Sequence, residues 1–196
     1  MNSALFEKGY EPAAYVGGLR NYRSMVKGLL SEAEAEADRE HVELLKQQAS
    51  KRKLPVRATV TTEDWCGDSA LNIPILADLF RQAGIELRIF RGSETTELKE
   101  MYESEGVDHI PVLSLWDGEN KEIGRWIEAP AAIAPMKDEW KAARPEFMTL
   151  YAQKDTDPEA AGRFAKMYRE FLDVMAGWYR NGMWQETTRE VAALLS

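Results

Sequence analysis

Hydrophobic and polar positions alternate with different periods through the centre of the chain. Residues 56–61 and residues 85–89 alternate with a period of two, which predicts two strands. Between them, apolar residues recur at helical spacing over 69–82, so we expect a helix that Pro74 kinks by removing one hydrogen bond. A strand, a helix and a second strand in this order predict a right-handed parallel crossover.

The pattern that follows predicts a short helix and then a hairpin. The helix should cover about residues 93–102, and strands are expected over 111–116 and 123–127. Asp117 and Gly118 supply the turn between these two strands. The hairpin adds antiparallel strands, so we expect an α/β fold with a mixed four-stranded sheet between helices.

Helical spacing dominates the N-terminal region. We expect one helix over about residues 12–30, which Gly17 and Gly18 weaken. A second helix should begin at Ser31, whose side chain can cap free backbone N–H groups while Glu34 completes a capping box.

The C-terminal region is helical as well. Asp157 followed by Pro158 predicts a helix start, Asn181 and Gly182 predict its end, and a last helix covers about 184–195. We therefore expect a single domain in three parts. These parts are an N-terminal helical extension at 1–53, a core at 54–145 and a C-terminal helical extension at 146–196.

Composition and charge limit the classes of function. The chain is 44% hydrophobic and 30% charged, as globular proteins are, and it has no apolar run long enough to span a membrane. Its 25 basic and 33 acidic residues give a formal charge of −8, which argues against nucleic-acid and anionic-membrane partners. Residues 1–10 lack the pattern of a secretory signal, so we expect a cytoplasmic protein.

Cys66 is the single cysteine, so an internal disulfide and a multi-cysteine zinc site are excluded. With His41 and His109 as the two histidines, we expect no metal site. Cys66 stands where the first strand gives way to a helix. The free N–H groups of a helix start favour a thiolate, which is the nucleophile in disulfide exchange.

The residues around this cysteine resemble the active site of the thioredoxin superfamily, which has Trp-Cys-Gly-Pro-Cys at the same junction. The segment here is Trp65-Cys66-Gly67-Asp68-Ser69. Pro74 matches the helix-kinking proline of thioredoxins, and the loop 106–112 is similar to the one that carries their cis-proline, here Pro111. Gly118 and Gly124 also match thioredoxin glycines.

This resemblance covers about residues 56–143 and implies a thioredoxin-like fold. More narrowly, the chain is similar to a bacterial thioredoxin-like group with a monothiol Trp-Cys-Gly-Asp-Ser site and helical extensions. Three positions depart from thioredoxins. Ser69 replaces the second cysteine, Asp68 replaces the proline, and Val60 replaces a buried carboxylate. Dithiol chemistry within one chain is therefore impossible.

The resemblance implies a role for each residue of the segment. Cys66 would be the nucleophile, Ser69 would donate a hydrogen bond to its thiolate, and the charge of Asp68 would raise the thiol pKa. The resemblance also implies a substrate groove, in which the backbone beside the cis-proline pairs with an extended peptide. Its residues are Trp65, Gly67, Asp68, Ile110 and Pro111, the last in cis. His109 is expected to be a surface residue, and Arg88 and Arg91 are expected to be solvated.

Three functions follow. The leading hypothesis is thiol–disulfide exchange or deglutathionylation of protein or small-molecule partners, with an external thiol such as glutathione as candidate co-substrate. The alternative is a redox-inactive module that binds peptides or proteins, which a Cys66 pKa at or above about 8.5 would favour. The third is a cluster-binding monothiol glutaredoxin, whose Cys-Gly-Phe-Ser site Trp65, Asp68 and Pro74 argue against. The helical extensions cover the sheet or build a dimer interface.

Overall fold

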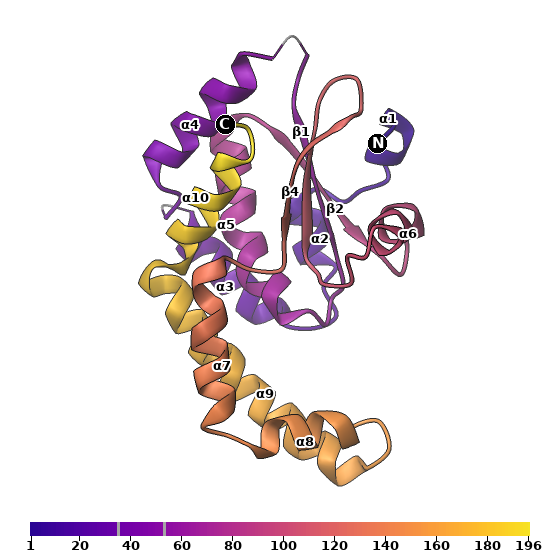
Figure 1. Ribbon diagram of the computed structural model, residues 1–196, viewed down its shortest axis with the longest axis vertical. Coiled ribbons are helices and arrows are strands. Elements are labelled where there is room, and N and C mark those ends of the chain that lie inside the picture. The colour runs from indigo at the N-terminus through magenta and orange to yellow at the C-terminus, as the bar shows by residue number, and fades with distance from the viewer. Residues whose placement is uncertain (35, 53) are drawn as a thin grey trace. The chain divides into compact units, whose positions relative to one another are not determined.

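The computed structural model describes residues 1–34, 36–52 and 54–196, and these residues form two compact units (Figure 1). Unit one comprises Met1–Ala129 and Trp184–Ser196, and unit two comprises Pro130–Met183. The expected boundary at 145/146 falls inside unit two. The one at 53/54 involves Lys53, which lies outside the described residues.

Within its described residues, unit one is built on a four-stranded mixed sheet in the order β2-β1-β3-β4. The strands are β1 (Arg57–Thr62), β2 (Glu86–Arg91), β3 (Val112–Trp116) and β4 (Glu122–Ile127). β1 is parallel to β2, with Val60 opposite Ile89, whereas β1 with β3 and β3 with β4 are antiparallel. The predicted α/β fold and its mixed sheet are confirmed.

Helices cover both faces of this sheet, with α5 on one side and α1 and α6 on the other (Figure 1). The helices of unit one are α1 (Ser3–Phe6), α2 (Pro12–Gly17), α3 (Arg23–Ala33), α4 (Arg39–Ser50), α5 (Gly67–Ala83), α6 (Thr96–Ser104) and α10 (Trp184–Ala193). On the α6 side, Phe90 of β2 and Trp116 of β3 pack with Tyr102 of α6 in one buried cluster. This packing fixes α6 beside the loop that precedes β3.

The helix expected over 12–30 is divided into two helices, and the break begins at Gly17 and Gly18, the residues expected to weaken it. α2 ends at Gly17, and α3 begins only after Tyr22, whose φ of 55° is left-handed. The expected helix start at Ser31 is wrong, because Ser31 lies inside α3, where Leu29 and Ala33 continue the buried stripe.

The next helix, α4, begins instead at Arg39. The side chain of Asp38 accepts a hydrogen bond of 2.8 Å from the N–H of Glu40, which caps the free end of the helix. Val42 and Leu45 then bury one face of α4. Asp38, seven positions after Ser31, is therefore the residue that caps the start of α4.

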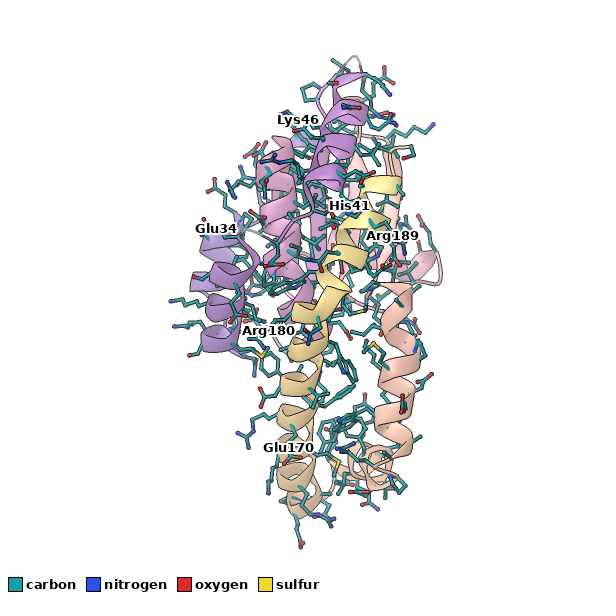
Figure 2. All side chains as sticks on the ribbon, turned by 90° about the vertical axis from the view of Figure 1, so that its left-hand side faces the viewer. Glu34, His41, Lys46, Glu170, Arg180 and Arg189 are labelled. Carbon is teal, nitrogen blue, oxygen red and sulfur yellow. The ribbon has the colours of Figure 1, made fainter. Side chains whose placement is uncertain are left out.

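α10 lies beside α4 and α5 and completes unit one (Figure 2). The indole N–H of Trp184 donates to the carbonyl oxygen of Leu71 in α5 at 3.0 Å, and His41 of α4 hydrogen-bonds Thr188 at 2.9 Å. Gly124 of β4 lets the chain just after α10 approach closely, since a Cβ there would lie 2.9 Å from the Cβ of Leu194.

Unit two is helical. It contains α7 (Ala134–Ala142), α8 (Glu146–Gln153) and α9 (Pro158–Trp178), followed by a π turn over Tyr179–Met183. Asp157 caps α9 by accepting from the N–H of Glu159 at 2.8 Å, so the predicted helix start is confirmed. Trp140 stacks on Phe171 with ring centroids 4.3 Å apart. No helix among the described residues is long and apolar enough to cross a membrane.

Candidate functional site

Cys66 is the N-cap of α5, at the end of the turn that follows β1. Its backbone is extended, and its sulfur lies 3.5 Å from the N–H of Ser69, which points toward it. The helix begins at Gly67, two residues before the expected Ser69, so the sulfur meets the first free N–H groups of the helix. The sequence therefore placed the cysteine correctly at a helix start.

The loop before β3 lies against the other side of the sulfur. The Ile110–Pro111 peptide bond is cis, as the resemblance implied. The thiol of Cys66 donates to the carbonyl oxygen of Ile110 at 3.3 Å. The two segments that the sequence singled out thus meet at Cys66.

The thiol of Cys66 is buried, with 7% of the residue exposed. Its pKa is raised to about 11, first because a buried thiolate loses hydration and, to a smaller extent, because of the negative charge of Asp68. Hydrogen bonds from Ser69 and the N–H of Asp68 act in the opposite direction but are smaller. Burial therefore outweighs the effect of the helix start, and the group is a protonated thiol at neutral pH.

Ser69 is itself buried, and its hydroxyl accepts a hydrogen bond from that of Thr62 at the end of β1. Its N–H and hydroxyl both act to lower the Cys66 pKa, which is the direction expected of this residue. Ser69 can stabilise a thiolate, but it cannot replace a second sulfur.

The loop between α2 and α3 covers the remaining side of Cys66. We call Leu19–Tyr22 the cover segment. Leu19, Asn21 and Tyr22 line a cavity of about 10 Å³ beside the sulfur. A cavity needs about 10–15 Å³ to hold one water molecule, so no larger reagent fits in this one. Tyr22 has its pKa raised by burial and by its closeness to Cys66.

A buried ion pair fastens the cover segment to the site. Arg91 Nε donates to Asp64 Oδ1 at 2.7 Å, and Asp64 Oδ2 accepts from the backbone N–H of Arg20 at 3.0 Å. The guanidinium of Arg91 also lies over the rings of Tyr10 and Tyr15, at 4.8 and 4.9 Å. Asp64 therefore joins the end of β2 to the segment that covers Cys66.

The expectation that Arg91 is solvated is wrong, since the residue is 6% exposed. Its partners come from the turn after β1 and from the N-terminal region, and neither is visible in the local pattern around β2. Arg88 is also largely covered, with 15% of its side chain exposed, and it pairs with Glu86 at 2.7 Å. The structure thus adds Asp64, Arg91 and Tyr22 to the site.

The predicted groove residues separate into two groups. Trp65, 62% exposed, and half-buried Ile110 line one cavity beside the loop before β3. Gly67 and Asp68 begin α5 and are not among the residues that line this cavity, and Pro111 is buried. His109 is exposed, as expected, and its ring hydrogen-bonds the carboxylate of Asp108 at 2.5 Å.

A sequence-family model described as "Thioredoxin" matches residues 14–141. The chain belongs to the thioredoxin family. The match includes the cover segment, Cys66 and the cis-proline loop of this thioredoxin-family chain. Comparison with curated protein sequences finds no significant match.

Two solved structures resemble the thioredoxin-family chain over almost its full length. One is a protein of unknown function from Pseudomonas aeruginosa, which is 21% identical with a TM-score of 0.59, covering 99% of this chain and 96% of that one. The other is an HIV epitope-scaffold, which is 19% identical with a TM-score of 0.58, covering 98% and 95%. At these identities the likeness shows the fold alone.

Proposed function

We propose that this thioredoxin-fold chain is a binding module that holds an extended segment of a peptide or protein across Trp65 and the loop of Ile110. The state of Cys66 carries the proposal. With a pKa of about 11, about one thiol in ten thousand is ionised at pH 7. Reactive cysteines keep an accessible thiolate, whereas inert ones are buried and protonated. Cys66 belongs to the second class.

The exposed aromatic side chain beside the groove is a second observation that supports this function. Trp65 is a large aromatic side chain with 62% of its surface exposed, next to a cavity. Exposed aromatic residues are enriched where proteins bind each other, because they bury a large apolar area at little cost in conformational entropy. Such a groove binds a partner without needing any thiol chemistry.

Selection from a phage-displayed library of random peptides on the immobilised protein tests this function. We expect peptides that bind the native chain and the Cys66→Ser variant equally but bind Trp65→Ala at least tenfold more weakly. Tyr151→Ala is the matched control, since Tyr151 is an aromatic residue of unit two with 50% exposure. Peptides that require Cys66, or that bind equally well without Trp65, would overturn the proposal.

A second candidate is monothiol exchange at the Trp65–Ser69 site, with glutathione as the resolving thiol. The position of Cys66 as helix N-cap, with the N–H of Ser69 directed at its sulfur, favours it. The Cys66 thiolate would attack the disulfide of a glutathionylated partner and take up the glutathionyl group, and the partner's thiolate would leave. A glutathione thiolate would then attack the Cys66 mixed disulfide and release glutathione disulfide.

This exchange requires the cover segment to move away from Cys66, because the residue is 7% exposed and the cavity beside its sulfur, which Tyr22 lines, is about 10 Å³. Incubation with a glutathionylated peptide, followed by mass spectrometry of the intact protein, separates the two functions. A glutathione adduct on Cys66 within minutes supports exchange. An unmodified chain that still binds its selected peptides supports the binding module.

A further inference from the structure

A cavity of about 570 Å³ opens on the α6 side of β1, next to Trp65. This volume lies within the range of about 300–1,000 Å³ typical of specific ligand sites. Its apolar walls come from three segments, the turn before α5, the helix α6 and the loop before β3. The apolar residues among them are Trp65, Tyr102, Val107, Ile110 and Val112.

Each charged residue that lines this cavity has a partner among its neighbours, and of their polar atoms only the Nη2 nitrogen of Arg91 is buried without a hydrogen bond among the described residues of this wall. The pairs are Arg20 with Glu94 at 3.4 Å, Glu63 with Ser93 at 2.9 Å, Asp64 with Arg91 at 2.7 Å, Lys99 with Glu103 at 3.3 Å and His109 with Asp108 at 2.5 Å. Each carboxylate in this wall therefore already has a partner, and a cationic ligand would find none free. The cavity fits a group that carries no positive charge and has a large apolar surface.

Thr61 supplies a second polar group that lacks a partner within the described part of the chain. Strand alternation places Thr59 and Thr61 on the same face of β1, toward α6, and Thr62 on the opposite face. The hydroxyl of Thr59 accepts from the indole N–H of Trp116 at 2.9 Å. The hydroxyl of Thr61 is buried and has no hydrogen-bonding partner among the described residues.

Buried polar groups are almost always hydrogen-bonded, so an unpaired hydroxyl in the wall of a cavity marks a position at which a ligand can supply the partner. Thr61 is 2% exposed and belongs to the wall of the cavity. Rotation about its χ1 exchanges the positions of methyl and hydroxyl, so the hydroxyl can reach a ligand that fills the cavity. A ligand that offers one hydroxyl at this wall would give Thr61 a partner.

We propose that the cavity binds the side chain of a tyrosine in the partner segment, with its ring among the apolar walls and its hydroxyl paired with Thr61. Trp65 offers the ring an aromatic neighbour at the mouth, where offset or edge contacts are favourable. The inference rests on the proposed function, since the tyrosine belongs to the segment held across Trp65. Short amide or hydroxyl side chains would leave the apolar walls uncovered.

The test uses N-acetyl-tyrosinamide and N-acetyl-phenylalaninamide as probes, titrated into the full chain and followed by the NMR shifts of residues around Thr61. We expect the tyrosine probe to bind about fivefold more tightly, which corresponds to one net hydrogen bond of about 1 kcal/mol. N-acetyl-lysinamide, which carries a charge, should bind more weakly than either.

Thr61→Val is the matched variant, because valine keeps the shape and the strand preference of threonine without its hydroxyl. We expect it to bind both probes equally and to melt no lower than the native chain, since an unpaired buried hydroxyl has been removed. A tyrosine preference that survives in Thr61→Val, or equal binding of both probes to the native chain, would overturn the inference.

The two proposals fail in different ways. Library peptides that depend on Trp65 but have no tyrosine, and that bind Thr61→Val as well as the native chain, would overturn the tyrosine site and leave the binding module intact. The absence of any peptide that depends on Trp65 would overturn both.

Discussion

Replacing Tyr22 with glycine should make Cys66 react faster with a thiol reagent. Tyr22 lines the small cavity beside the sulfur, and its φ of 55° is a conformation that glycine adopts readily. The variant therefore removes the ring that covers the thiol while keeping the course of the backbone. The fold should persist, because a left-handed non-glycine residue costs roughly 1–2 kcal/mol that glycine does not.

The size of the effect follows from the Cys66 pKa of about 11. At pH 8 about 0.1% of such thiols are ionised, against about 24% for an ordinary cysteine with a pKa near 8.5. Complete return of Cys66 to ordinary solvation would raise the thiolate fraction about 200-fold. A less basic thiolate is also a weaker nucleophile, which offsets about tenfold of this gain and leaves a rate increase of about 20-fold.

The assay follows the reaction of each protein with 5,5′-dithiobis(2-nitrobenzoate) by absorbance over a pH series. Tyr151→Gly is the control, because it removes an exposed aromatic residue of unit two and should leave the rate unchanged. Two results would refute the reasoning. One is a folded Tyr22→Gly protein that reacts at the native rate, and the other is a native protein that reacts as fast as a free cysteine.

Three further predictions concern stability, each measured by urea denaturation. Because the Cys66 pKa is raised in the folded protein, its contribution to the free energy of unfolding is complete below about pH 8.5 and is lost as the pH rises toward 11. The free energy of unfolding of the native chain relative to Cys66→Ser should therefore fall by about 2 kcal/mol between pH 7 and pH 10. A difference that stays constant with pH would contradict this prediction. Arg91→Met leaves buried Asp64 without its cation and should cost about 3–5 kcal/mol, whereas a loss below about 1 kcal/mol would show a dispensable pair. Trp184→Phe removes the hydrogen bond to Leu71 and should cost about 1–3 kcal/mol, with an unchanged midpoint as the contrary result.

The core of the fold was predictable because its signals are local. Alternation over β1 and β2, helical spacing over α5 and the turn before β4 each depend on neighbours a few residues apart. The positions of Cys66 and of the loop before Pro111 followed from the same pattern together with the family resemblance. Local periodicity was thus sufficient for the core elements, and the resemblance added the residues of the site at their ends.

The state of the site was not predictable, because it depends on contacts distant in sequence. Cys66 is buried by Tyr22 and its neighbours, which come from the N-terminal region. Arg91 appears as a charge at a strand end until Asp64 and Tyr15 are placed around it. In the sequence around Cys66, the helix start and the serine favour a lower thiol pKa and the aspartate favours a higher one, so the direction of the net shift stays open. Burial by segments distant in sequence decides it.

The place of unit two along the chain has a consequence for how the protein unfolds. Pro130–Met183 begins after β4 and ends where α10 begins, so both of its ends are joined to unit one. If the helices of unit two unfold while unit one stays folded, residues 130–183 become a flexible loop between β4 and α10. The hydrogen bond from Trp184 to Leu71 holds α10 on unit one. The closure entropy of a flexible loop grows by only about 0.6 kcal/mol for each doubling of its length. Unit one can therefore keep its sheet, its cysteine and its groove while the inserted helices exchange their amide hydrogens.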